Sequence, residues 1–249
     1  MKALDNLGAR YTSILFALSW IVAGVAAAHL AAFLVPGRWV LPLVNAGLFS
    51  VLFLAALRRG DYSRAVRLGI IWGVITSLVQ IGLTLGWPSF MESRIWHSVQ
   101  YRREMFTWVR TGAGPEGDIR LFLPIHLKHF TIFCAASAAS GGLLGLTMGA
   151  VLLGYMNFYV GCLVTQSADP LVASLLAWPV WSVVRVVGYI IAGTALGALL
   201  VHRDRERAGG KFLRIKRMFL LALALIVLDI FLKWALAGVY QQALERAFT

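Results

Sequence analysis

Residues 218–240 read MFLLALALIVLDIFLKWALAGVY, a run in which Asp229 and Lys233 are the only charged residues. A helix needs about 20 consecutive apolar residues to cross the hydrocarbon core of a bilayer, so this run is long enough to span a membrane. The run therefore predicts a transmembrane helix that carries two charges within it.

Comparable apolar runs recur along the whole chain. Hydrophobic residues make up 59% of the sequence and charged residues only 14%, which is typical of a chain surrounded by lipid. The pattern predicts an all-α fold, a polytopic bundle of about six to seven transmembrane helices, in a single membrane domain covering residues 1–249. The predicted spans are 13–35, 39–57, 66–87, 130–164, 171–201 and 218–240.

The net charge of +12 has its origin in short basic loops between apolar runs. In a soluble protein such a charge would suggest a nucleic-acid partner. Here the basic residues gather at 58–67 and 202–217, and an excess of Lys and Arg is typical of cytoplasmic loops. We therefore expect the lipid bilayer, and not nucleic acid, to be the partner of this charge.

The two basic loops also constrain the topology, because an even number of crossings must separate two loops on the same side. Residues 130–164 would extend about 52 Å as one helix, far beyond a hydrocarbon core of roughly 30 Å. We expect this run to form a tight helical hairpin or a re-entrant pair, broken at residues 140–142 or at Gly154. Residues 165–170 contain no Lys or Arg and are expected on the outside.

Residues 89–111 differ from the apolar runs, since they mix charged with aromatic side chains. Arg102, Arg103 and Arg110 alternate with Trp96 and Trp108. This pattern predicts an amphipathic helix that lies in the headgroup region of the membrane or against a partner.

Three charged residues fall near the middle of the last two predicted spans: Arg185, Asp229 and Lys233. Each costs roughly 2.5–3.5 kcal/mol at a helix centre, so we expect pairing, with Arg185 bound to Asp229. The first interpretation is a charge clamp that fixes helix order, with Lys233 partly snorkelling outward. The alternative is an ion or proton path, or a site for an anionic ligand.

Histidines offer two further candidate sites. His29 lies within the first span and is either a hydrogen-bonded packing residue or a ligand of a haem or chlorin. His126 and His129, together with His97 and Glu92, form a weak candidate for a metal site. The alternative is that they are ordinary residues at the membrane boundary.

Small residues recur at intervals of four, which allows close approach of helices. We expect packing within the chain, with contact to a partner subunit as the alternative. Asn45, Gln80 and Asn157 are expected to form hydrogen bonds between spans. The small residues concerned are Ser137, Gly141, Gly145, Gly149, Gly193 and Gly197.

From His129 onward the sequence resembles the stage II sporulation protein M family of bacterial membrane proteins. Gly141-Gly142 and the glycines from Gly145 to Gly161 resemble its Gly-rich helical pair, and Asp229 stands where that family has a buried acid. The resemblance implies a non-catalytic partner in a membrane assembly. Further points of resemblance are Asn157, and Pro179 followed by Gly188, Gly193 and Gly197, whereas Phe158 and Trp181 occupy positions of family glycines.

Catalytic signatures are missing from the sequence: it contains no HExxH, GxSxG or phosphate-binding Gly-Lys-Ser/Thr motif. We therefore expect no enzymatic activity and no required cofactor. The leading hypothesis is a scaffold or accessory subunit of a larger complex in the plasma (inner) membrane of a bacterium, with other membrane subunits as partners. The alternatives are a transporter or channel subunit that uses the charged residues, and a cofactor-bearing electron-transfer or light-harvesting subunit.

Overall fold

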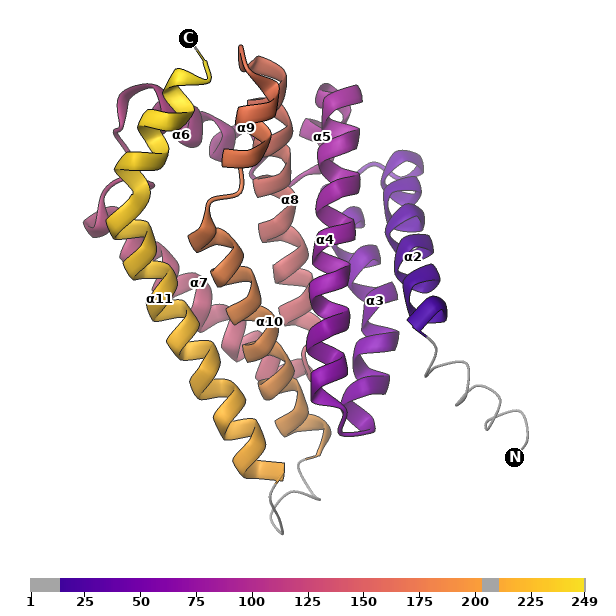
Figure 1. The fold of residues 1–249 in the computed structure, drawn as a ribbon. Helices are drawn as coiled ribbons and strands as arrows, with labels where there is room; N and C mark the ends of the chain where they lie inside the picture. Colours follow the sequence, from indigo (N-terminus) through magenta and orange to yellow (C-terminus); the bar gives the residue numbers. More distant parts are fainter. Residues whose placement is uncertain (1–13, 203–210, 249) are drawn as a thin grey trace.

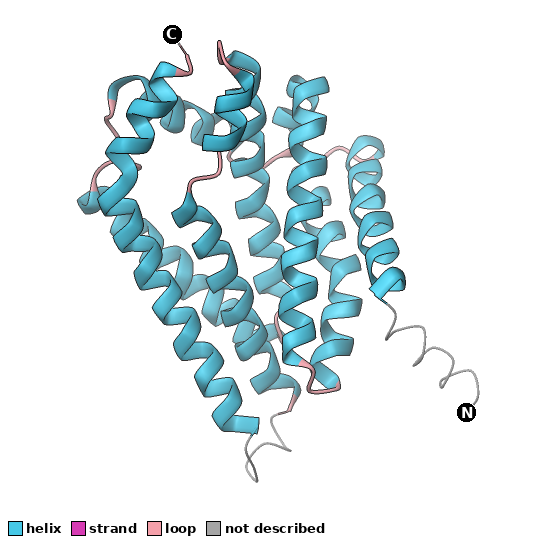
Figure 2. Cartoon of the chain, viewed as in Figure 1, coloured by secondary structure: helices cyan, strands magenta, loops and turns pink. Residues whose placement is uncertain are grey.

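The computed structural model describes residues 14–202 and 211–248, which fold into helices joined by short loops, with no strand among them (Figure 2). Seven helices in these ranges are long and apolar enough to cross a membrane. The predicted all-α polytopic bundle is confirmed. The seven are α2 (Ile14–Leu34), α3 (Val40–Arg58), α4 (Tyr62–Gly86), α7 (Ile119–Ser140), α8 (Leu143–Gln166), α10 (Val180–Val201) and α11 (Lys211–Arg246).

Three short helices lie between the spans: α5 (Pro88–Arg94), α6 (Ser98–Thr111) and α9 (Pro170–Leu176). Local sequence signals explain where helices begin. The Asp61 side chain accepts a hydrogen bond from the Arg64 N–H at the start of α4, and Asp118 accepts one from Arg120 N–H at the start of α7. These carboxylates satisfy N–H groups that have no partner within the helix.

The predicted hairpin is present as α7 and α8, and its break lies at Gly141 and Gly142. Their φ angles of 64° and 97° are in the left-handed region, where glycine is the residue that fits without strain. Both helices are long enough to span, so the re-entrant alternative is wrong. The predicted start at residue 130 is also wrong, because α7 begins at Ile119 and includes His126 and His129.

The topology agrees with the even number of crossings. The α3–α4 turn, the α7–α8 turn, the end of α10 and the start of α11 share one end of the bundle, opposite α5, α6 and α9 (Figure 1). His202 Nε2 lies 2.7 Å from the Leu57 carbonyl oxygen, and Arg214 donates to Ser63 Oγ at 2.9 Å. These contacts join the flanks of the two basic loops, although residues 203–210 of the second loop lie outside the described residues.

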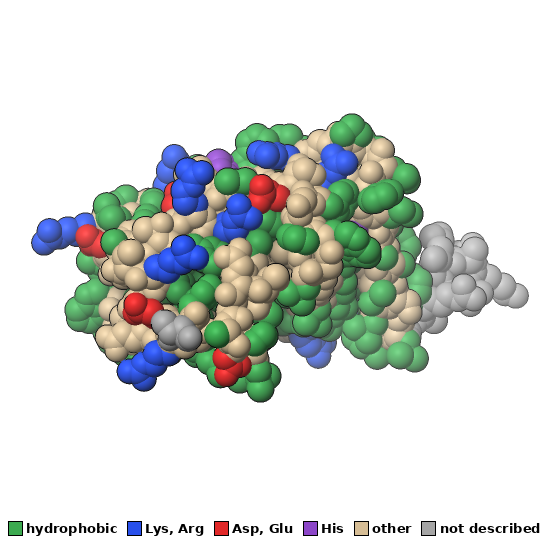
Figure 3. Space-filling view, turned by 90° about the horizontal axis from the view of Figure 1, so that it is seen from above, with side chains coloured by type: hydrophobic (Ala, Val, Ile, Leu, Met, Phe, Trp, Pro, Cys, Tyr) green, Lys and Arg blue, Asp and Glu red, His purple; other side chains and the backbone are tan. Residues whose placement is uncertain are grey.

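The region predicted as a single interfacial helix at 89–111 is two helices instead. The chain is extended at Ile95 and left-handed at His97, with φ 57°, which separates α5 from α6. Charged and hydrophobic side chains intermingle at this end of the molecule (Figure 3). The apolar face of α6 is buried in the bundle, with Trp108 2% exposed.

Three other predicted spans have different bounds. The third span was predicted from residue 66, but α4 begins at Tyr62 and includes Arg64 and Arg67. Residues 171–201 form α9 and α10, separated around Pro179, whose ring fixes φ and whose nitrogen carries no hydrogen to donate. The last span is longer than 218–240, because α11 extends from Lys211 to Arg246.

Polar side chains in the spans bind one another across helices, as predicted. Trp72 Nε1 donates to Asn45 Oδ1 at 2.9 Å, and Asn45 Nδ2 donates to Thr76 Oγ1 at 3.3 Å. Asn157 Nδ2 donates to Gln80 Oε1 at 2.7 Å. These bonds connect α4 to α3 on one side and to α8 on the other.

The small residues mostly allow close packing within the chain. A Cβ at Gly145 would overlap Ser137 Oγ, and one at Gly197 would lie 2.8 Å from the Gly141 carbonyl oxygen. At Gly193 the nearest atom would be Phe133 Cζ, at 3.1 Å, whereas a Cβ at Gly149 would meet nothing within 4 Å. The structure thus favours packing within the chain for these glycines, with Gly149 as the exception.

Candidate ligand cavity

A cavity of about 490 Å³ lies inside the bundle, with walls from α4, α6, α7, α8, α10 and α11. Its volume falls in the range of small-molecule sites, about 300–1,000 Å³. Gly73 and Gly149 line it, and a Cβ would meet Leu153 Cδ1 only at 3.9 Å at Gly73 and nothing within 4 Å at Gly149, so these two glycines leave part of the space open. Some glycines of the bundle therefore allow helices to pack closely, and others leave space for the cavity.

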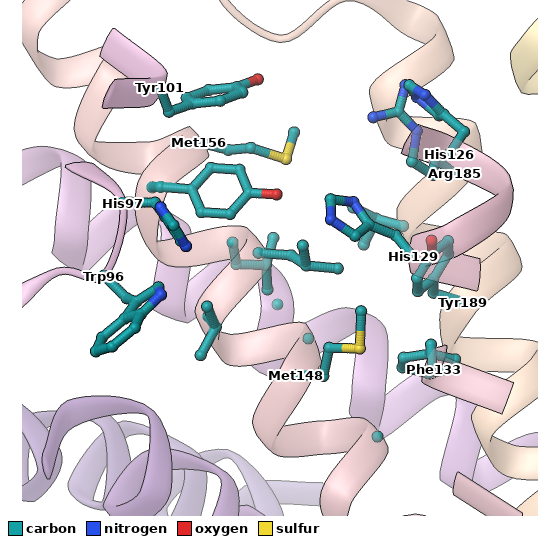
Figure 4. Close-up of a pocket in the computed structure, with 18 of the residues that line it drawn as sticks. Trp96, His97, Tyr101, His126, His129, Phe133, Met148, Met156, Arg185 and Tyr189 are labelled. Atoms are coloured by element: carbon teal, nitrogen blue, oxygen red, sulfur yellow. The ribbon is translucent and has the colours of Figure 1, made fainter. Parts of the chain in front are cut away.

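Aromatic and sulfur-containing side chains form much of the wall (Figure 4). Tyr101 packs on Tyr155 with ring centroids 4.5 Å apart, and Trp96 packs on Trp39 at 4.8 Å. The break between α5 and α6 makes the second contact possible, because it turns the chain at Trp96. The wall is suited to an apolar or aromatic ligand surface.

Arg185 and Asp229 form an ion pair at the charged end of the cavity. Arg185 Nε lies 2.9 Å from Asp229 Oδ2, and Arg185 Nη2 lies 2.9 Å from Asp229 Oδ1. This bidentate geometry is the contact predicted from the sequence. Arg185 lines the cavity, whereas the Asp229 side chain is 0% exposed behind it.

Lys233 binds Glu116, a residue that the sequence analysis did not single out. Its Nζ lies 2.8 Å from Glu116 Oε2 and 4.4 Å from the centre of the Phe122 ring. The Lys233 side chain is 2% exposed, so the prediction that it snorkels outward is wrong. Trp181 Nε1 donates to the other oxygen, Glu116 Oε1, at 3.2 Å.

Glu116 stands in the loop between α6 and α7, and both of its oxygens are engaged. Burial by itself raises the pKa of this carboxyl, but Lys233 and Arg185 outweigh burial and hold the pKa below its ordinary value of 4.5. Glu116 is therefore ionised at neutral pH. For Tyr101, burial and the nearby Glu116 raise the phenol pKa well above 10.0, so its hydroxyl stays protonated.

Glu116 was missed because its setting suggests a solvent-exposed turn. Gly112, Gly114, Pro115 and Gly117 surround it, and such residues are typical of surface loops. The sequence nevertheless contained an indication of this contact. Lys233 lies within a span and needs an acidic partner, and the nearby Asp229 is already paired with Arg185.

The three histidines His97, His126 and His129 project into the same space (Figure 4). His126 Nδ1 lies 2.8 Å from the Phe122 carbonyl oxygen. In the described part of the chain no three His, Cys, Asp or Glu side chains are placed to hold a metal ion, and the metal interpretation stays a prediction. Glu92, the fourth candidate, instead binds Arg102 at 2.6 Å.

His29 lies in α2, away from the cavity walls. Its Nδ1 is 2.7 Å from the Val25 carbonyl oxygen, and the side chain is 8% exposed. This arrangement fits the interpretation of a hydrogen-bonded packing residue.

Comparison of the chain with models of protein families, with curated proteins and with solved structures finds no match. The resemblance to the stage II sporulation protein M family therefore stays a prediction.

Proposed function

We propose that the protein is a membrane carrier, a transporter that binds a small molecule in the cavity inside its spanning bundle. The observation that supports this proposal is the combination of a partly enclosed cavity of about 490 Å³ with charged side chains in its wall. Sites for small molecules are mostly apolar, with a few polar groups that fix the orientation of the ligand. The cavity has both features.

The charged residues support a binding role, because placing an ionised side chain inside a membrane costs free energy. Arg185, Asp229 and Lys233 lie within spanning helices, where ionised side chains are expensive and commonly mark ligand or ion pathways. A clamp that only fixed helix order would not need an adjoining void. Here Arg185 and Glu116 line the cavity with side chains that are 18% and 13% exposed, so a ligand can reach them, and Lys233 lies directly behind Glu116.

We also propose that the protein resides in the plasma membrane of a bacterium, with the α3–α4 turn and the start of α11 facing the cytoplasm. The concentration of Lys and Arg near both segments supports this orientation. The end that carries α5, α6 and α9 then faces outward.

Native mass spectrometry of the protein, purified in mild detergent, tests the proposal. We expect wild type to retain a small molecule and Gly149→Trp to lose it, because the indole fills the cavity. Gly238→Trp is the matched control, since Gly238 is exposed on α11 and a Cβ there meets nothing within 4 Å. Equal retention by wild type and Gly149→Trp would contradict the proposal.

The accessory-subunit hypothesis stays a prediction with less support from the geometry. Part of its basis was the set of small-residue faces, and Gly145, Gly193 and Gly197 pack against residues of the same chain. Its remaining bases are the lack of catalytic motifs in the sequence and the segment rich in Trp and Arg at residues 89–111. Co-purification of other subunits from native membranes in fixed proportion would support it.

A further inference from the structure

We propose that the ligand is an acidic amphiphile, whose carboxylate or phosphate head binds Lys233 and Trp181 in the place that Glu116 occupies and whose apolar tail lies in the cavity. This inference rests on the proposed function and names its substrate class. In the absence of ligand, the Glu116 carboxylate occupies the place of the head group.

The geometry around Glu116 is that of a carboxylate-binding site. Lys233 Nζ donates to one oxygen at 2.8 Å, and Trp181 Nε1 donates to the other at 3.2 Å. Two donors from two spanning helices, α11 and α10, thus converge on one carboxylate. A free acid can accept the same two hydrogen bonds with the same geometry.

Of the two ion pairs, the Glu116–Lys233 pair is the one in which a ligand anion can replace the acid. Asp229 belongs to spanning helix α11, is held by two hydrogen bonds to Arg185, and is fully buried. Glu116 belongs instead to the short loop between α6 and α7, and it lines the cavity. It can move away without unwinding a spanning helix.

The departure of Glu116 requires another anion to take its place. Breaking a buried pair by removing one partner is strongly destabilising, because a charge is left without compensation. Lys233 is 2% exposed, so water does not replace the lost partner well. An incoming carboxylate or phosphate keeps the site neutral.

A cationic ligand does not suit the same place. Arg185 and Lys233 already supply two positive charges at this end, and the acids beside them, Glu116 and Asp229, are each bound to one of the two. An amine at this place would bring a third positive charge beside acids that are already bound, and like charges at close range repel strongly in a medium of low polarity.

The tail has an apolar path next to the charged end. Phe122 lies beside Lys233, and the wall continues through Phe133, Met148 and Met156 (Figure 4). Flexible methionines and aromatic rings accommodate an alkyl chain of variable shape. The cavity therefore offers an anchored head and an adaptable apolar chamber, which is the requirement of an amphiphile.

Calorimetric titration of the protein in phosphatidylcholine nanodiscs tests this inference, with decanoate, decyl phosphate, decanol, decylamine and inorganic phosphate as probes. We expect decanoate and decyl phosphate to bind at least about tenfold more tightly than decanol, since hydrogen bonds to an ionised acceptor are stronger than those to a neutral hydroxyl. Decylamine and inorganic phosphate should not bind measurably.

Substitutions in the proposed head-group site test where the acid group of the ligand binds. Glu116→Gln removes the competing carboxylate and should tighten decanoate binding, whereas Lys233→Met should abolish the preference for decanoate over decanol. Trp181→Phe removes one donor and should weaken decanoate without changing decanol, which keeps the test valid if Lys233→Met fails to fold. Leu78→Met, at an exposed position of α4, is the neutral control.

The outcomes separate the two proposals. Equal binding of decanoate and decanol, or a preference for decylamine, would overturn the acidic amphiphile and leave the cavity as a ligand site. Binding of inorganic phosphate as tightly as decyl phosphate would overturn the role of the tail. No binding of any probe, together with an empty cavity in native mass spectrometry, would overturn the proposed function as well.

Discussion

Lys233 Nζ lies 2.8 Å from Glu116 Oε2, although the two residues are 117 positions apart in the sequence. The contact connects the loop between α6 and α7 to the last spanning helix at the charged end of the cavity. It makes the position of this loop dependent on a charge within α11. Any change in the protonation of Glu116 therefore acts on both the cavity and the stability of the fold.

Acid should weaken this contact. Because the pKa of folded Glu116 lies below its ordinary value of 4.5, the carboxylate contributes its full stabilisation above about pH 4.5 and loses it as the pH falls through the lower folded value. The difference in free energy of unfolding between wild type and Glu116→Gln should shrink over this acidic range and stay constant at higher pH. Denaturation in detergent at a series of pH values measures it. A difference that grows on acidification would contradict the prediction.

The Arg185–Asp229 pair should matter greatly for stability. Arg185→Leu or Asp229→Leu alone should cost about 3–5 kcal/mol, because each leaves a buried charge unpaired. The double variant should recover much of that loss, since no charge then remains without a partner. Thermal unfolding in detergent gives the double-mutant cycle, and additive losses would exclude a direct pair.

Gly145 and Gly149, both on α8, should respond differently to the same substitution. Gly145→Ala places a Cβ against Ser137 Oγ and should cost about 1–3 kcal/mol, as overpacking does. Gly149→Ala enters open space and should change stability by no more than about 1 kcal/mol. Ser137→Ala in combination should relieve part of the cost at Gly145. Equal effects at the two glycines would show that the close contact between α7 and α8 is wrong.

The orientation of the bundle can be tested by single cysteines in a background lacking Cys134 and Cys162. Asp61 lies in the α3–α4 turn, and Ala168 is exposed at the opposite end of the bundle. An impermeant thiol reagent added to intact cells should label Ala168→Cys and spare Asp61→Cys, and disrupted cells should show both. Labelling of Asp61→Cys alone would reverse the orientation.

Much of the architecture follows from local sequence signals. The hairpin break at Gly141 and Gly142 was predictable because a single helix over 130–164 would be too long for a bilayer and glycine tolerates left-handed backbone. The pairing of Arg185 with Asp229 was predictable too, since charges at similar depth in consecutive spans have few other partners.

The candidate site was only partly predictable, because it depends on how helix faces meet. Nothing in the local sequence indicates that His97 adopts a left-handed conformation and separates α5 from α6. The role of Glu116 depends on a loop that folds inward to Lys233, a contact set by packing far along the chain. The cavity itself is lined by residues of several helices that are distant in the sequence, so it depends on how those helices pack.

The central claim is that a small molecule occupies the cavity lined by α4, α6, α7, α8, α10 and α11. A cryo-electron microscopy map of wild-type protein, taken from native membranes into nanodiscs without added ligand, tests it most directly. The account predicts non-protein density inside the cavity, in contact with its charged end. A cavity filled by the protein's own side chains, or one that holds ordered water alone, would contradict it.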